Sequence, residues 1–268
     1  MSNRMMVTGA GSGLGREIAQ RWAREGWQLA LCDLDERRLE ETLRLVRAEG
    51  GDGFIRRCDV RDYSQLSAFA EACEARLGGI DVLVNNAGVA SGGFFEELSL
   101  EDWDWQLSVN LMGVVKGCKA FLPLILRSQG RIINVASMAA LMQGPGMSNY
   151  NVAKAGVVAL SESLLVELRG QGVKVHVLCP SFFQTNLLDS FRGPTPEMKA
   201  AVGKLLEGSP ISAADIAEYL YQQVAEGAFM ILPHEAGREA WAGKCRNPEP
   251  LYAEMAHMAD RMRAKARS

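Results

Sequence analysis

The chain has 268 residues, of which 48% are hydrophobic and 23% are charged, and its net charge is -3 at neutral pH. This length suits one large α/β domain with a full hydrophobic core. The slightly negative charge provides no basic surface for nucleic acid. The six cysteines are scattered without metal-ligand spacing, and no hydrophobic run is expected to be long enough to cross a bilayer. We therefore expect a cytoplasmic protein with reduced thiols, no metal site and no membrane partner.

The first predicted element is a short apolar strand over 4–8, followed by a glycine-rich loop and a helix. In this context, backbone N–H groups at the start of a helix can bind a pyrophosphate. Gly9 and Gly13 would let the backbone approach the phosphates, and Gly15 would let the helix pack closely on the strand. A flexible turn is the alternative. The predicted cofactor-binding residues of this loop are Gly9, Ser12, Gly13, Leu14 and Gly15.

The second predicted strand, 28–32, ends in Asp33, which follows Gly15 by 18 residues. A carboxylate at this position would hold the adenosine ribose hydroxyls and would repel a 2′-phosphate. Ser12 offers no compensating cation in the loop, and we interpret Arg37 and Arg38 as solvated. Asp33 therefore favours NAD over NADP, with a simple helix cap as the alternative interpretation.

The middle of the chain repeats the strand–helix alternation. A strand over 54–58 leads to Asp59 and Val60, and a helix is predicted over about 63–77. The next strand, 80–84, ends in Asn85-Asn86-Ala87-Gly88, where small residues and amides suit close approach of a ligand. A turn would explain this tetrapeptide equally well. One long helix is predicted over 103–126, and its Asn110 is interpreted as a core amide rather than a functional one.

A fifth strand, 131–136, ends in Ser137, which is either a site residue or the cap of a turn. An apolar loop and a helix over 149–169 follow. Tyr150 and Lys154 are four residues apart on this helix and so lie on the same side. A nearby ammonium favours the phenolate, so Lys154 is expected to lower the pKa of Tyr150. By itself, however, this spacing is typical of a surface pair.

The last third begins with a strand over 173–178 that runs into Pro180. An apolar segment over about 184–210 is predicted to be a substrate lid. A helix over 215–224 and a strand over 229–232 complete the predicted domain, 1–232. Residues 233–268 form a C-terminal extension that belongs either to the same domain or to a subunit interface.

The motifs, in this order, resemble the short-chain dehydrogenase/reductase family from Thr8 to about Leu232. Ser137 and Tyr150 also have the family's usual thirteen-residue separation. The resemblance implies a Rossmann-type, doubly wound sheet of seven parallel strands in a single domain with a C-terminal extension. Pro180-Ser181 departs from the family's Pro-Gly. The matching residues are Thr8, Gly9, Gly13, Gly15, Asn85, Asn86, Ala87, Gly88, Asn110, Ser137, Tyr150 and Lys154.

The resemblance also implies hydride transfer between a nicotinamide and an alcohol or carbonyl carbon. By this likeness Tyr150 is the acid/base and Ser137 holds the substrate oxygen. Lys154 binds the nicotinamide ribose, and Asn110 holds a water in the proton relay. Further cofactor contacts implied by the resemblance are Asp59, Val60, Asn86, Ala87, Gly88, Pro180, Phe183 and Thr185, together with Tyr150 and Lys154.

The expected site lining is apolar, which favours a lipophilic secondary alcohol or ketone as substrate. An NADPH-dependent carbonyl or 3-oxoacyl thioester reductase is the alternative, and a non-enzymatic dinucleotide-sensing protein is a minor one. The predicted oligomer is a homodimer or homotetramer built on the helices over 103–126 and 149–169. The predicted substrate contacts are Ser137, Met138, Met147, Tyr150, Phe182 and Leu187.

Overall fold

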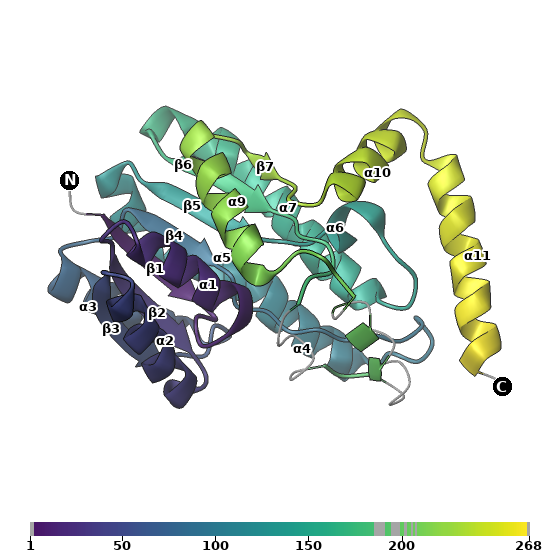
Figure 1. Ribbon diagram of the computed structural model, residues 1–268, viewed down its shortest axis with the longest axis horizontal. Helices are drawn as coiled ribbons and strands as arrows, with labels where there is room; N and C mark the ends of the chain where they lie inside the picture. The colour runs from purple at the N-terminus through teal and green to yellow at the C-terminus, as the bar shows by residue number, and fades with distance from the viewer. Residues whose placement is uncertain are drawn as a thin grey trace.

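A computed structural model describes residues 3–184, 191–193, 199–200, 203–204, 206 and 208–266. Seven strands form one parallel sheet in the order β3-β2-β1-β4-β5-β6-β7, with helices on both faces (Figure 1). The predicted Rossmann-type, doubly wound sheet of seven parallel strands is therefore confirmed. Thr185, Leu187 and much of the predicted lid over 184–210 lie outside the described residues.

The strands read as nearly continuous apolar runs because the sheet is covered on both faces. In β4, for example, all four residues are buried. The bounds of the strands are β1 (Arg4–Thr8), β2 (Gln28–Asp33), β3 (Asp52–Arg57), β4 (Val82–Asn85), β5 (Arg131–Val135), β6 (Lys174–Leu178) and β7 (Met230–Ile231).

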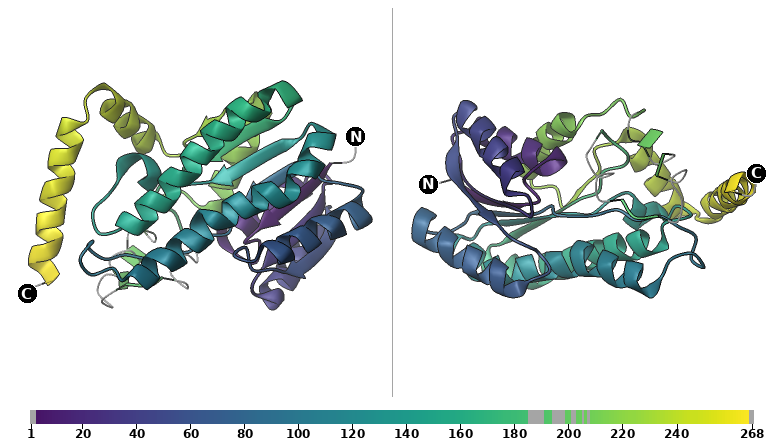
Figure 2. Two further views of the ribbon diagram at one scale, coloured as in Figure 1. Left: turned by 180° about the vertical axis from the view of Figure 1, so that it is seen from behind. Right: turned by 90° about the horizontal axis from the view of Figure 1, so that it is seen from below.

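Two helical layers enclose the sheet, each with its own hydrophobic cluster (Figure 2). One layer contains α1 (Gly13–Ala23), α2 (Glu36–Ala48) and α9 (Ala213–Glu226). The other contains α3 (Tyr63–Leu77), α4 (Leu100–Asn110), α5 (Met112–Ser128) and α7 (Ser148–Leu168). Two short helices, α6 (Ala139–Met142) and η1 (Arg169–Gln171), follow β5 and α7.

The single long helix predicted over 103–126 is wrong, because the structure contains two helices separated at Leu111. The combined stretch Leu100–Ser128 is long and apolar enough to cross a membrane, contrary to the sequence-based expectation. However, 50% of its most apolar window is buried inside the protein. This is what a core helix pair of a layered domain requires, since the residues that face the sheet must be apolar.

A chain of buried polar side chains ties the sheet to α7. Asn85 Nδ2 donates to Asn134 Oδ1 at 2.9 Å, and Asn134 Nδ2 donates to Ser161 Oγ at 3.0 Å. Gly117 of α5 leaves room for this network, because a Cβ there would overlap Asn85 Oδ1. The network fixes β5 and α7 relative to each other; Ser137 follows β5, and Tyr150 lies on α7.

The C-terminal extension forms α10 (Glu235–Arg246) and α11 (Glu249–Ala266), and α11 projects away from the sheet (Figure 1). Lys244 Nζ of α10 donates to the Leu141 carbonyl at 2.5 Å. Near the far end of α11, Arg263 pairs with Glu96 and stacks over the Phe94 ring at 3.9 Å. The extension therefore contacts the segments that follow β5 and β4.

Candidate active site

The carboxyl ends of β1 and β4 lie side by side at the point where the strand order reverses, which is where open α/β sheets bind ligands. Thr8 Oγ1 accepts the N–H groups of Asn86 and Ala87, each at 2.9 Å. Asn86 Nδ2 donates in return to the carbonyls of Thr8 and Gly9, at 3.0 and 3.1 Å. These hydrogen bonds connect the start of the glycine-rich loop, after β1, to the predicted cofactor-binding segment after β4.

The glycine-rich loop packs closely against the segment that follows β4 and against the first turn of α1. Gly9 has a φ of +63°, and a Cβ there would lie 2.7 Å from the Ala87 Cα. A Cβ at Gly15 would overlap the Gly9 carbonyl oxygen. Ser12 precedes α1 without capping it through its side chain, so the first N–H groups of α1 remain available to an anion. The side chain of Leu14 is only 6% exposed, which limits its contact with a ligand to the backbone.

Asp33 lies directly beside the loop. Its Oδ2 accepts the Gly11 N–H at 3.0 Å, and its Oδ1 accepts the Asp35 N–H at 3.1 Å. Each carboxylate oxygen keeps a further lone pair for a hydroxyl donor. Arg16 Nη2 donates to the Gly11 carbonyl at 2.6 Å, so that cation is engaged by the backbone.

Arg38 borders the glycine-rich loop. A Cβ at Gly11 would be 3.1 Å from the Arg38 Cβ, and Arg38 Nε lies 3.5 Å from Asp35 Oδ2. Its side chain is nevertheless exposed, as is that of Arg37.

The next two predicted cofactor residues follow β3. The Asp59 carboxylate pairs with Arg61 Nη2 at 2.6 Å, and hydrogen bonds from Arg61 lower the pKa of Asp59. Val60 is only 8% exposed and packs against Gly113, where a Cβ would lie 2.9 Å from Val60 Cγ2. Asp59 therefore keeps its negative charge, while Val60 presents little surface.

Asn110 is fully buried and holds the loop after Gly88. Its Oδ1 accepts the Val89 N–H, and its Nδ2 donates to the Val89 carbonyl, both at 2.8 Å. This geometry matches the core-amide interpretation, since both amide atoms bind the backbone. A Cβ at Gly88 would lie 3.3 Å from Asn110 Oδ1 and 3.6 Å from Lys154 Nζ. The absence of a side chain at Gly88 thus keeps open the space between these two residues.

Ser137, Tyr150 and Lys154 converge beyond the end of β5. Ser137 Oγ accepts the Ala139 N–H at 3.1 Å, and the Ser137 hydroxyl acts to lower the pKa of the Tyr150 phenol. Lys154 is 4% exposed, and its Nζ donates to the Val135 carbonyl at 2.9 Å. The ammonium lies 5.9 Å from the centre of the Tyr150 ring. The three side chains therefore form one cluster beside Gly88.

The electrostatics of this cluster differ from the sequence-based expectation. Burial raises the pKa of the Tyr150 phenol, and the Ser137 hydroxyl opposes that rise only in part. Burial also lowers the pKa of Lys154 to about 8. The prediction that Lys154 would lower the pKa of Tyr150 below its ordinary value is wrong for the protein chain by itself. Desolvation, which disfavours the charged phenolate, is the largest contribution to this shift.

Comparison with known proteins decides the family. Residues 3–194 match the family model described as short chain dehydrogenase. The chain belongs to the short-chain dehydrogenase family. It is 35% identical over 234 residues to the 2-(R)-hydroxypropyl-CoM dehydrogenase of Xanthobacter autotrophicus, covering 85% of this chain and 93% of that protein. The probable oxidoreductase EphD of Mycobacterium bovis, 40% identical over 184 residues, is longer, and this chain spans 31% of its length.

Two solved structures share the fold. A short-chain dehydrogenase/reductase from Burkholderia phymatum in complex with NAD has a TM-score of 0.87 at 34% identity, covering 92% of this chain and 94% of that one. An alcohol dehydrogenase from Thermococcus sibiricus complexed with 5-hydroxy-NADP has a TM-score of 0.73 at 28% identity, covering 83% and 90%. One of these two similar structures thus contains NAD, and the other contains an NADP derivative.

The predicted substrate lining of this short-chain dehydrogenase is only partly assembled in the described residues. Met147 is half-buried and pairs with Gly93 in an isolated bridge. Phe182 is 38% exposed, whereas Phe183 is 9% exposed and belongs to the core cluster of α1 and α9. Met138 is 6% exposed. Phe183 therefore acts through packing rather than as part of an open pocket wall.

Two positions of the site were missed from the sequence. The Val135 carbonyl fixes Lys154, but a backbone acceptor leaves no side-chain signal. His234, which the sequence does not single out, hydrogen-bonds the segment that follows Pro180. Its only signal was the unusual sequence after the last predicted strand, Leu232-Pro233-His234.

Proposed function

We propose that this short-chain dehydrogenase transfers a hydride between NAD(H) and a lipophilic secondary alcohol or ketone, with Tyr150 as the acid/base. The observation that carries the proposal is the cluster of Ser137, Tyr150 and Lys154 beyond β5, in which the buried Lys154 ammonium lies 5.9 Å from the centre of the Tyr150 ring. An alcohol can lose hydride only if its O–H proton also leaves, so a base must lie within hydrogen-bond reach of the oxygen. The Tyr150 phenolate can accept that proton.

The residues present fit a dinucleotide. Gly9 and Gly15 lie where side chains would block the loop, the N-terminus of α1 has no side-chain cap, and Asp33 has acceptor capacity to spare. When bound, NAD+ supplies the hydride acceptor and a positively charged ring. The protein positions the alcohol and moves its proton.

The roles of the side chains follow from their chemistry. Tyr150 Oη takes the hydroxyl proton during oxidation and returns it during reduction. Ser137 Oγ donates a hydrogen bond to the substrate oxygen as negative charge develops there. Lys154 Nζ, held by the Val135 carbonyl, places a positive charge beside the phenol and can bind a ribose hydroxyl. Asn110 supports this cluster by fixing the backbone of Val89.

Turnover with a series of secondary alcohols tests the proposal. With NAD+ as oxidant, we expect kcat/KM to rise as the apolar chain lengthens, because each buried CH2 contributes about 0.8 kcal/mol. Activity confined to NADPH and 3-oxoacyl thioesters would instead support the carbonyl-reductase alternative. Tight dinucleotide binding without turnover of any alcohol or ketone would support the non-enzymatic alternative.

Asp33 carries the proposed preference for NAD. Asp33→Asn keeps an acceptor for the Gly11 N–H but removes the charge that would repel a 2′-phosphate. We expect kcat/KM with NADP+ to rise and affinity for NAD+ to fall, each by about tenfold, the size of one hydrogen bond to a charged group. Both cofactors should be titrated by fluorescence, with Asp104→Asn on the exposed side of α4 as the control. Tighter binding of NADPH than NADH by the wild-type chain would contradict the preference.

We also propose that the protein is a cytoplasmic homodimer or homotetramer. Exposed apolar side chains on α5 and α7 support an interface that includes these helices, since oligomers bury such surface at symmetric contacts. These residues are Met112, Val152 and Val166, which are 43%, 49% and 77% exposed.

A further inference from the structure

His234 connects the C-terminal extension to the segment that leaves β6. The Ser181 N–H donates to His234 Nδ1 at 3.2 Å, and His234 Nε2 lies 3.1 Å from the Phe182 carbonyl oxygen. A backbone N–H can only donate and a carbonyl can only accept. Nδ1 must therefore be unprotonated, and Nε2 must carry the proton. The contacts thus define one neutral tautomer of the imidazole.

The same segment is held from its other side by the end of β5. The Pro180 carbonyl accepts the Met138 N–H at 2.8 Å, and Ser137 Oγ lies 3.4 Å from the same oxygen. Pro180, Ser181 and Phe182 are therefore fixed between the proposed substrate-binding serine and His234. Movement of this segment would disturb the surroundings of Ser137 directly.

The C-terminal extension supports His234 itself. The His234 carbonyl accepts the Arg238 N–H at 3.1 Å in the first turn of α10. Gly237 of α10 lies against Met138, where a Cβ would be 3.3 Å from the Met138 side chain. Burial lowers the pKa of His234, and the positive charge of Arg238 acts in the same direction. The hydrogen bond to the Phe182 carbonyl raises the pKa of His234, but the net shift is downward and favours the neutral imidazole.

We propose that His234 is a positioning residue that holds Ser181 and Phe182 beside Ser137 and thereby shapes the wall of the nicotinamide pocket. This inference rests on the proposed function, because the segment after β6 borders a nicotinamide only if the protein binds one. It gives the start of the C-terminal extension a role in cofactor binding. The imidazole itself touches neither the substrate oxygen nor the proton that Tyr150 moves.

The tautomer can be tested without cofactor. Long-range 1H–15N spectra of the full-length 15N-labelled protein at neutral pH should show His234 with a proton on Nε2 and none on Nδ1. Hydrogen exchange of the Ser181 amide should accelerate by about tenfold in His234→Ala, since one net hydrogen bond is lost. A proton on Nδ1, or unchanged Ser181 exchange, would overturn the contact on which the proposal stands.

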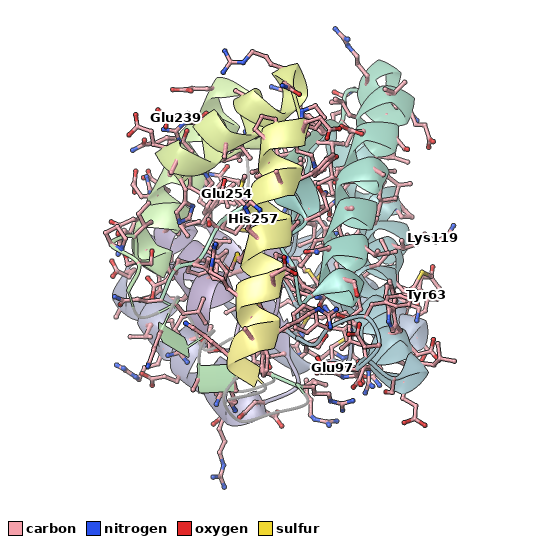
Figure 3. All side chains as sticks on the ribbon, turned by 90° about the vertical axis from the view of Figure 1, so that its right-hand side faces the viewer. Tyr63, Glu97, Lys119, Glu239, Glu254 and His257 are labelled. Atoms are coloured by element: carbon pink, nitrogen blue, oxygen red, sulfur yellow. The ribbon has the colours of Figure 1, made fainter. Side chains whose placement is uncertain are left out.

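The consequence for cofactor binding needs matched variants. His234→Ala removes both hydrogen bonds, whereas His234→Asn can keep the acceptor toward Ser181 and His234→Gln can keep the donor toward Phe182. We expect the Kd for NADH to rise about tenfold in His234→Ala and less in the other two. KM for NAD+ should rise more than kcat falls. The control is His257→Ala, because His257 is exposed on the projecting α11 (Figure 3).

The outcomes separate the inference from the proposed function. Wild-type NADH affinity in His234→Ala would overturn the positioning role while leaving the oxidoreductase proposal intact. A wild-type chain that does not bind NADH would overturn the proposed function and, with it, the role of His234 toward a nicotinamide. The cofactor-free spectra would still show whether His234 holds Ser181.

Discussion

Replacing Tyr150 by phenylalanine should lower kcat for alcohol oxidation by about 10³-fold, within the 10²–10⁴-fold range that a positioned acid/base contributes. The substitution removes only the phenolic oxygen and keeps the aromatic ring against its neighbours. Binding of NADH, measured by fluorescence titration, should therefore change by less than about twofold, well below the effect of one lost hydrogen bond to a charged group. Loss of kcat without loss of cofactor affinity is the signature of proton transfer.

Tyr63→Phe provides the matched control. Tyr63 is 46% exposed at the start of α3, and it lies on the outer surface (Figure 3). We expect this variant to keep wild-type kcat and KM. Wild-type turnover in Tyr150→Phe would remove the proposed mechanism, because that mechanism moves the hydroxyl proton through the phenolic oxygen.

The sequence was sufficient for the fold because strand, loop and helix signals agreed at every step. The apolar run of β4 and the glycine loop before α1 both point to a covered parallel sheet, and the structure has that sheet. Sequence was insufficient at Leu111, where the apolar pattern continues through a break between α4 and α5. The last residue of α4, Asn110, exchanges two hydrogen bonds with the backbone of Val89, a tertiary contact that the local apolar pattern does not reveal.

The sequence predicted which side chains come together better than it predicted how their pKa values shift. Spacing alone indicated that Tyr150 and Lys154 share one side of a helix, and the structure places the ammonium 5.9 Å from the ring centre. The sign of the pKa shift at Tyr150 depends on how much water surrounds the phenol, which no local pattern specifies. His234 was missed for a similar reason, since its partners Ser181 and Phe182 lie 53 and 52 residues away in sequence.

Replacing Lys154 by methionine should raise the pH at which alcohol oxidation becomes fast. A unit charge at about 6 Å in an effective dielectric of about 20 contributes roughly 3 kcal/mol, or about 2 pH units. Removing the ammonium disfavours the phenolate, so the acid limb of kcat/KM should move upward by up to that amount. At pH 7, kcat/KM should fall by about 10²-fold through this shift alone, and further if a ribose contact is lost.

The pKa of Lys154, about 8, sets the window of this effect. Below pH 8 the wild-type lysine is charged and assists the phenolate, whereas above pH 8 it becomes neutral and the two pH profiles should converge. Lys119→Met, which alters an exposed lysine of α5 (Figure 3), should leave the profile unchanged. Parallel profiles at all pH values would contradict a through-space charge effect and would assign Lys154 to binding alone.

Thermal melting distinguishes this effect from misfolding. Because the pKa of Lys154 is lowered in the folded protein from 10.5 to about 8, burial of the charged lysine destabilises the fold below pH 8. That cost declines as the pH rises from 8 to 10.5, where the folded protein binds fewer protons than the unfolded chain.

Lys154→Met removes the charge at similar side-chain length but also removes the bond to the Val135 carbonyl. We therefore expect its Tm at pH 7 to equal or exceed that of the wild type, with the difference shrinking toward pH 10. A much lower Tm at pH 7 would show that the bond to Val135 outweighs the cost of burying the charge.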